Sequence, residues 1–422
     1  MSLVALACDW YARNRETLTA VDALLGGGLL TWGALRQQPL RLPRRNRPRR
    51  SDPAPTSTEM FSQAIEQIGS AKLAVCLGGI HTLDRIARQS RPDHGAVTEI
   101  LAALIRQRAP WPDPTAAATA SIHDAAAAPS SYRWQRSADV VAALDVIIRR
   151  RAADGIAADA RLNLTRTNLA GASLRQAPLH GADLFAANLT EADLAAADLS
   201  QADLRRACLR RANLVGANLS GANLTGSNLT QANVRAADLT GATISWADLS
   251  GAILYAANLS GATILEARFS GANLHRADLR GARLGDCDLN AAQLGGADLS
   301  GARLERVSLR GAVLGRSNLS QTFLYGADLT AADLQAANLR RADLSWADLS
   351  GADLAWADLS DAILYGAKLI GARLTGADLR RADIRTADLT GACIDDAVLR
   401  DAIVLTPANS DVKPGATPRA AE

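Results

Sequence analysis

The stretch ADLTAADLQAANLRRADLSWADLSGADL, residues 327–354, decides the fold of this chain. It repeats a five-residue unit in which alanine, then aspartate or asparagine, then leucine are followed by two variable residues. The same period runs from Leu164 to Leu399, where all 48 positions spaced five residues apart are apolar and 42 are leucine. Alanine stands two residues before this central residue in 41 of the 48 units.

A period of five matches neither the 3.6 of an amphipathic helix nor the 2 of a strand. A chain that turns a corner every five residues closes a four-sided coil after about 20 residues, and each central residue then stacks on the one a coil ahead. Leucine fills the axis of such a coil, and only a small residue such as alanine fits beside it. Backbone groups bond to the coils above and below. The repeats therefore predict a solenoid.

The A(D/N)LXX motif resembles that of the pentapeptide-repeat family, and the resemblance covers residues 162–404. It implies a mainly β fold, a right-handed quadrilateral β-helix of about 12 coils and roughly 58 Å in length at about 4.8 Å per coil. The segments FSQAIEQIG (61–69) and LGGIHTLDRIA (77–87) are similar to the N-terminal helical region of a bacterial subset of this family. Some of those relatives carry hydrophobic segments before that region.

The rest of the chain divides into four further regions. Residues 57–155 show apolar residues at helical spacing and predict a small α-helical module before the solenoid. Residues 36–56 are rich in arginine and proline and predict a linker, and residues 405–422 predict a disordered tail. Residues 1–35 predict an N-terminal helix or a weak membrane anchor.

The membrane interpretation depends on length and on flanking charge. The uncharged stretch 23–35 has 13 residues, and a membrane-spanning helix needs about 20. We therefore expect a cytoplasmic protein, with membrane association through residues 18–50 left open. The residues that would contact an anionic surface are Arg41, Arg44, Arg45, Arg47, Arg49 and Arg50.

Nothing in the sequence predicts catalysis. The five cysteines lie far apart and form no CxxC pair, which disfavours disulfides and a zinc site and favours a reducing compartment. The five histidines are scattered, and no nucleophile motif occurs. Carboxylates at regular solenoid spacing form a solvated face rather than a tuned acid–base pair. We expect no enzyme activity, no metal and no cofactor.

The family resemblance also implies a second function, because some members mimic a DNA duplex, act on DNA gyrase and form end-to-end dimers. An acidic column does run along one corner of successive coils here, from Asp198 to Asp378. However, residues 161–405 carry 24 basic beside 26 acidic residues, whereas a duplex carries about one charge per 1.7 Å. This balance disfavours both gyrase and nucleic acid as partners.

Two surfaces are candidates for contact with a protein. The repeat register places five apolar residues on one face, where polar residues are expected; they are Phe323, Tyr325, Trp346, Ile363 and Tyr365. Such a cluster is typical of a protein-binding patch, although aromatic side chains stacked to stiffen the surface would look the same. The last central residues have only a polar tail after them and predict a C-terminal end-to-end homodimer; they are Leu389, Ile394, Leu399 and Val404.

The function predicted from these features is that of a non-catalytic scaffold or protein-binding rod. Its partner is a protein that the sequence does not identify. The alternative is a DNA-mimicking modulator of DNA gyrase or another topoisomerase, which the balanced charge disfavours.

Overall fold

The computed structural model describes residues 57–111, 137–154 and 161–404. The regions predicted over residues 1–35, 36–56 and 405–422 lie outside the described residues. Contacts divide the described chain into two compact units. One holds residues 57–104 with 138–147, and the other holds residues 105–111, 148–154 and 161–404.

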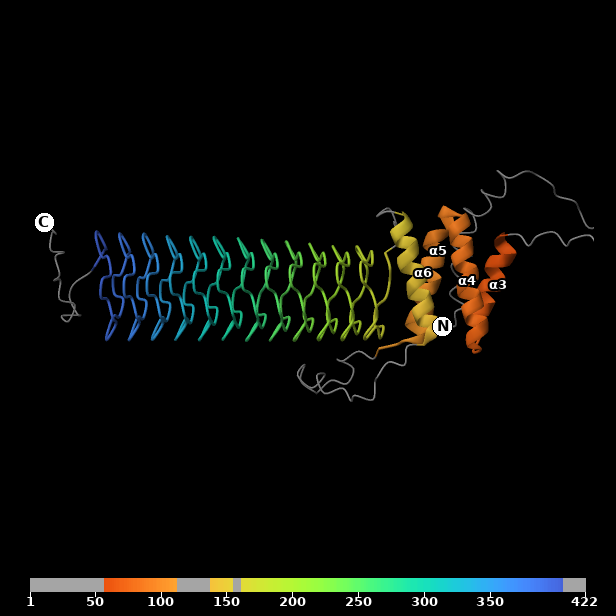
Figure 1. The fold of residues 1–422 in the computed structure, drawn as a ribbon, viewed down its shortest axis with the longest axis horizontal. Helices are drawn as coiled ribbons and strands as arrows, with labels where there is room; N and C mark the ends of the chain where they lie inside the picture. The colour runs from red at the N-terminus through yellow and green to blue at the C-terminus, as the bar shows by residue number, and fades with distance from the viewer. Residues whose placement is uncertain (1–56, 112–136, 155–160, 405–422) are drawn as a thin grey trace, which may run out of the picture. The chain divides into compact units, whose positions relative to one another are not determined.

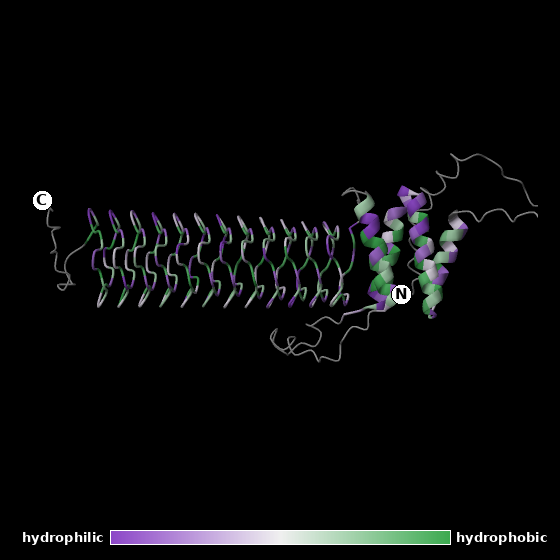
Figure 2. Ribbon diagram, in the orientation of Figure 1, coloured by the Kyte–Doolittle hydropathy of each residue, from purple (hydrophilic) through white to green (hydrophobic). Residues whose placement is uncertain are grey.

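Among the described residues, four α-helices and one 3₁₀ turn precede the repeats (Figure 1). They are α3 (Ser57–Ile68), α4 (Leu73–Gln89), η1 (Arg91–Asp93), α5 (His94–Arg108) and α6 (Ala138–Asp154). The apolar residues that recur at helical spacing are buried, among them Ile80 and Leu83 on α4. Figure 2 shows the resulting hydrophobic and hydrophilic faces of the helices.

Helices α3 and α4 approach each other closely at a glycine. A Cβ atom at Gly79 would lie 2.8 Å from the carbonyl oxygen of Ala64 and 2.8 Å from Cγ2 of Ile68. Both α3 residues are fully buried. No larger residue fits at Gly79 without moving the backbone of α3, so the glycine sets the distance between these two helices.

The repeats form a solenoid of stacked four-sided coils (Figure 1). The aspartate or asparagine of each unit forms a parallel bridge with the residue 20 positions later, as in Asn218 with Asp238 and Asp238 with Asn258. Backbone bonds run in both directions, from Leu219 N to Asp238 O at 2.6 Å and from Asp238 N to Ala217 O at 2.9 Å. Each side is too short for a long strand, so the solenoid is built from single bridges. The expected β-helix solenoid is confirmed by this pairing.

The solenoid core consists of the leucine and alanine positions. Both Leu219 and Ala217 are fully buried, as are their counterparts along most of the stack, and Phe269 takes the place of one leucine without reaching the surface. Hydrophilic and hydrophobic residues alternate around each coil in Figure 2. Three of the four hydroxyls that replace alanine donate to a carbonyl three residues earlier, as those of Thr167 and Ser227 do at 2.7 and 2.6 Å, whereas the buried hydroxyl of Ser317 has no such partner.

The corners are made by the two variable residues after each leucine. A bond from the alanine N–H to the preceding leucine carbonyl closes most turns, as from Ala217 N to Leu214 O at 3.0 Å. The second variable residue has a positive φ at every turn from Arg166 to Asp401, and 19 of these 48 residues are glycine. A positive φ at the third residue of a four-residue turn favours glycine, because other residues carry a Cβ that crowds the backbone.

Gly216 tests the cost of this conformation. Its φ is 64°, and an added Cβ would meet no atom within 4 Å. We expect Gly216→Ala to lower the free energy of unfolding by about 1 kcal/mol through backbone strain alone. The reverse change Ala236→Gly, one coil later at a φ of 52°, is expected to be neutral or stabilising. Urea unfolding followed by circular dichroism measures both, and equal destabilisation by the two changes would contradict the strain argument.

Candidate protein-binding surfaces

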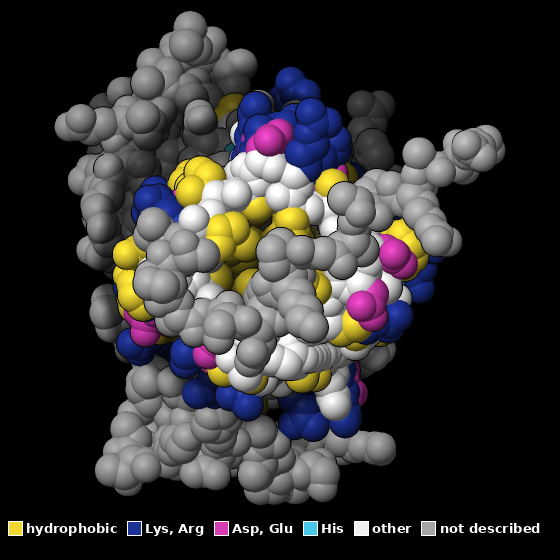
Figure 3. Space-filling view, turned by 90° about the vertical axis from the view of Figure 1, so that its left-hand side faces the viewer, with side chains coloured by type: hydrophobic (Ala, Val, Ile, Leu, Met, Phe, Trp, Pro, Cys, Tyr) yellow, Lys and Arg dark blue, Asp and Glu magenta, His cyan; other side chains and the backbone are white. Residues whose placement is uncertain are grey.

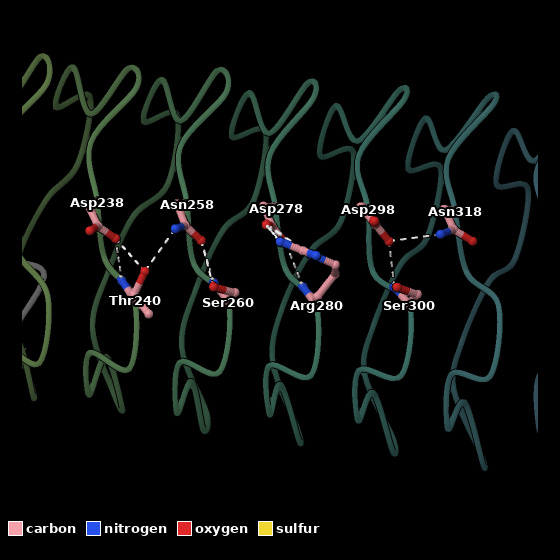
Figure 4. A network of polar contacts seen from close by, with 9 residues as sticks. All are labelled: Asp238, Thr240, Asn258, Ser260, Asp278, Arg280, Asp298, Ser300 and Asn318. Carbon is pink, nitrogen blue, oxygen red and sulfur yellow. Dashed lines mark hydrogen bonds and ion pairs between the residues drawn. The ribbon is translucent and has the colours of Figure 1, made fainter.

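The acidic column predicted along one corner lies instead in a side of the solenoid. Its residues form the parallel bridges, and the turns come two residues later. Each carboxylate or amide oxygen accepts the backbone N–H two residues on, as from Ser300 N to Asp298 at 3.0 Å. Figure 4 shows this network, in which Asn318 Nδ2 also donates to Asp298 Oδ1 at 2.9 Å. These side chains therefore hold the turns in place, which explains why aspartate and asparagine alternate freely.

Arginines pair with some of the carboxylates in this column. Arg280 donates to Asp278 at 2.6 Å (Figure 4), and Arg380 pairs with Asp378 in the same way. The arginine hydrogen bonds hold the pKa of both carboxyls below the usual value, although partial burial acts in the opposite direction. At least fifteen of the 24 basic residues of the solenoid pair with a carboxylate of the described residues. The surface is thus a mixed, paired one rather than a row of phosphate-like charges.

The five apolar residues of the candidate patch all lie exposed on the solenoid, and we call them the aromatic patch. Phe323 and Ile363 occupy bridge positions in one side, two coils apart. Tyr325 and Tyr365 are the first residues of the turns that follow, and Trp346 is the second residue of the turn between them. The exposed fractions run from 37% for Tyr365 to 57% for Trp346.

Trp346 lies over a glycine of the next coil. A Cβ at Gly366 would come within 2.9 Å of the indole ring, so the glycine makes room for it. The ring of Trp346 meets that of Tyr365 edge to face, with centroids 5.8 Å apart and planes at 79°. Trp356 lies over Gly376 in the same manner on another corner.

Arginines from neighbouring coils stack on the patch. Arg303 lies over Phe323 with its guanidinium carbon 5.8 Å from the ring centroid, and Arg385 lies over Tyr365 at 5.7 Å. Such contacts stabilise exposed aromatic rings by about 0.5–1 kcal/mol. Neither stacking arginine was predicted from the sequence, although each lies 20 residues from its ring and the 20-residue coil period alone could have identified it.

The first coil of the solenoid is covered by residues 109–111 and Arg151, which belong to the same compact unit as the solenoid. Trp111 N donates to Arg166 O at 2.7 Å and Asn168 N donates to Ala109 O at 2.8 Å, so a short antiparallel pairing closes this end. The guanidinium of Arg151 donates to the carbonyls of Pro178 and His180 at 2.8 and 3.1 Å. The backbone groups of the first turns are therefore satisfied by protein.

The last described coil exposes its core. Leu389 and Ile394 are half-buried, and Leu399 and Val404 expose 37% and 59% of their surface, whereas the central leucines inside the stack are fully buried. Figure 3 views this end and shows hydrophobic side chains in the middle of a ring of basic and acidic ones. The end thus presents an apolar surface with a charged rim, as a contact between copies would require.

No group of three or more histidine, cysteine, aspartate or glutamate side chains among the described residues is arranged to hold a metal ion. Cys287 is buried beside the carbonyl of Ile264, and burial raises the pKa of its thiol to about 12, which keeps it protonated and unreactive.

Neither candidate for membrane contact can be placed. Within residues 57–111, 137–154 and 161–404, no helix is long and apolar enough to cross a bilayer. The stretch 18–50, including Arg41, Arg44, Arg45, Arg47, Arg49 and Arg50, lies outside these ranges. Its contact with an anionic surface stays a prediction.

The fold and its surfaces define a repeat protein of the β-helix solenoid class. A family model described as pentapeptide repeats matches residues 160–184, 182–221, 217–254, 252–290, 287–326, 327–364 and 362–401, more than half of the chain. The chain belongs to the pentapeptide-repeat family. Comparison with curated proteins found no match.

Solved structures of other pentapeptide-repeat proteins are similar to this chain. HetL from the cyanobacterium Nostoc sp. strain PCC 7120, involved in heterocyst differentiation regulation, is 40% identical over 51% of this chain and 89% of HetL, with a TM-score of 0.32. Trypsin-treated QnrB1, a plasmid-mediated fluoroquinolone resistance protein, is 21% identical over 43% of this chain and 89% of its own, with a TM-score of 0.37.

Gly366 is the position that tests how the aromatic patch is held. We expect Gly366→Ala to displace Trp346 and so to cost about 1 kcal/mol of unfolding free energy beyond the backbone strain, because the edge-to-face contact with Tyr365 is lost. Gly371→Ala is the matched control, since its φ of 64° is similar and an added Cβ there meets nothing within 4 Å. Thermal unfolding of the two variants gives the difference, and equal midpoints would show that the indole does not depend on the glycine.

Proposed function

We propose that this chain is a non-catalytic scaffold whose solenoid presents the aromatic patch to a protein partner. The observation that carries the proposal is the exposure of five large apolar side chains on one side and its adjoining turns. From Asn163 to Arg303 the residues of the same bridge column are polar, for example Asn223 and Thr243; after Ile363 the column holds one further apolar residue, Ile403 in the last described coil. Large exposed aromatic residues in a cluster are enriched where proteins bind one another.

A role in stiffening the solenoid surface explains the exposure of the aromatic patch less well than binding to a partner does. The contact between Trp346 and Tyr365 does link two coils. Yet Trp346 still exposes 57% of its surface, and Phe323 and Tyr325 expose 49% and 50%. A role confined to stiffening would be met by burying these rings against the coil, so the exposed area favours a partner.

A DNA-mimicking modulator of gyrase is the weaker proposal. Its acidic column is tied to the turns by hydrogen bonds and paired with arginines such as Arg280 and Arg380. Paired carboxylates do not present the continuous potential of a duplex. Unchanged gyrase supercoiling in the presence of the purified chain is the expected result.

Alanine substitutions test the patch against a matched tryptophan. We expect Trp346→Ala and Tyr365→Ala each to weaken capture of the partner about ten-fold or more, because exposed aromatic anchors dominate such interfaces. Trp356→Ala should leave capture unchanged, since Trp356 has the same turn geometry and 65% exposure but lies on another corner. Affinity capture from the source cells, quantified for each variant, measures this; equal retention by all three variants would reject the proposal.

The C-terminal end supports a second proposal, an end-to-end homodimer. Joining two copies there would cover Leu399, Val404 and the half-buried Leu389 and Ile394. Burial of apolar area of this kind is the main driving force for association. A closed two-fold contact between identical ends would also stop further growth of the stack.

Charge placed at this end should separate the copies. We expect Leu399→Lys together with Val404→Lys to remove the end-to-end contact and so to weaken self-association in sedimentation experiments, because two lysines would face their own symmetry mates. Ile253→Lys is the control, since Ile253 is 39% exposed but belongs to a coil in the middle of the stack. A wild-type chain that sediments as a monomer at high concentration would dismiss the dimer.

A further inference from the structure

Asp343 is an acidic residue without a counter-charge in the middle of the aromatic patch. It is bridged to Phe323 on one coil and to Ile363 on the next. Its Oδ1 accepts from Ser345 N at 3.0 Å and from Ser345 Oγ at 2.6 Å. No basic side chain of the described residues forms an ion pair with it, so its second oxygen stays available to a ligand.

Trp356 and Asp353 form the equivalent pair of tryptophan and aspartate elsewhere on the solenoid. Asp353 stands three residues before Trp356, as Asp343 stands before Trp346. Its carboxylate is taken, because Arg373 lies 3.2 Å away and Gln335 donates at 2.7 Å. The tryptophan and the acid therefore recur in the same register, but only the pair in the aromatic patch keeps its carboxylate open.

The indole ring of Trp346 lacks a stacked cation among the described residues, just as Asp343 lacks an ion-pair partner. Elsewhere on the solenoid, arginines stack on aromatic rings one coil away, as Arg205 does on Phe185 at 5.5 Å and Arg235 on Tyr255 at 5.2 Å. Within the described residues no cation stacks on Trp346. An indole face beside an unpaired carboxylate is the combination that an arginine from another chain would complete, since guanidinium groups stack on rings and pair with carboxylates.

The C-terminal coils and one other segment of this chain have complementary charge. Residues 321–405 hold 13 acidic and 8 basic residues, whereas residues 36–50 hold seven arginines and no acidic residue. No other stretch of the chain concentrates positive charge to this degree. Attraction between such surfaces sets both orientation and association rate.

The spacing of the arginines agrees with the spacing of the coils. Arg41, Arg44, Arg47 and Arg50 recur every third residue, among three prolines. Bound in a polyproline II conformation, three residues advance about 9.3 Å and place these arginines on one stripe. Two coils of the solenoid advance about 9.6 Å, which is the separation between Phe323 and Ile363 on either side of Asp343 in one column.

We propose that residues 36–50 of a second copy of this chain bind along the aromatic patch, with one arginine over Trp346 and paired with Asp343. This inference rests on the proposed function of the patch as a protein-binding surface. The charge complementarity and the matched spacing identify the segment, and we commit to a second copy as its source; self-association of the chain distinguishes this source from the same chain.

A labelled peptide of residues 36–50, RQQPLRLPRRNRPRR, tests the contact by fluorescence anisotropy against the full chain. We expect Trp346→Ala to weaken binding at least about ten-fold and Asp343→Asn about five-fold, with both losses reduced at high salt. Asparagine keeps the bond to Ser345, as Asn223 does with Thr225, so the variant should fold. Trp356→Ala and Asp353→Asn are matched controls and should bind as the wild type does.

Two results would overturn the inference. One is equal affinity of the Trp346→Ala and Trp356→Ala variants; the other is equal affinity for a scrambled peptide that keeps the composition but loses the three-residue spacing. Either would mean attraction by net charge alone. If the peptide fails while cellular capture still depends on Trp346, the inference is wrong and the proposed function stands.

Self-association of the full chain tests the second copy. In the Leu399→Lys/Val404→Lys variant, which lacks the end-to-end contact, we expect association at concentrations above the peptide dissociation constant, and the further change of Arg44→Glu with Arg47→Glu to abolish it. Leu399→Lys should leave peptide binding unchanged, which separates this contact from the C-terminal end. A chain that binds the peptide but stays monomeric above that concentration would reject the second copy as its source.

Discussion

The left-handed residue at every fifth position is the constraint on which the rest of the solenoid depends. It turns the chain after each leucine, so that four turns bring a residue back above itself 20 positions later. Aspartate or asparagine then caps the turn it precedes, as Asn218 does for Ser220. Leucine and alanine then occupy the interior of the coil. Turn geometry, turn capping and core composition therefore all follow from the left-handed residue at every fifth position.

The coil could be predicted from the sequence because its determinant is a period. Leucine at every fifth residue and alanine before it are visible without any structure, and the 20-residue repeat follows from four corners. The positive φ could not be predicted with the same ease, because 29 of the 48 corner residues are not glycine. Arg381 and Trp356 adopt this conformation since the surrounding bonds leave no alternative, and sequence preference at a single position does not reveal that.

The aromatic patch was predictable as a set of positions but not as an arrangement. Register alone brought Trp346 and Tyr365 to neighbouring coils. It did not show that Trp346 lies over Gly366, that Arg385 stacks on Tyr365, or that Asp343 lacks an ion-pair partner among the described residues. Those features depend on which rotamer each long side chain adopts, and rotamers respond to neighbours 20 residues away rather than to adjacent residues.

A repetitive scaffold makes its exceptions informative. Where an arginine stands two residues after an aspartate, as Arg380 does after Asp378, the two side chains form an ion pair. Such a pair leaves little for a partner to gain, because exposed ion pairs contribute only about 0–1 kcal/mol. Where an acid lies between apolar residues, as Asp343 does, the same turn is capped yet one oxygen stays unpaired. The backbone tolerates both arrangements equally, since capping uses only one oxygen. Binding specificity can therefore vary along the solenoid without any change in the fold that carries it.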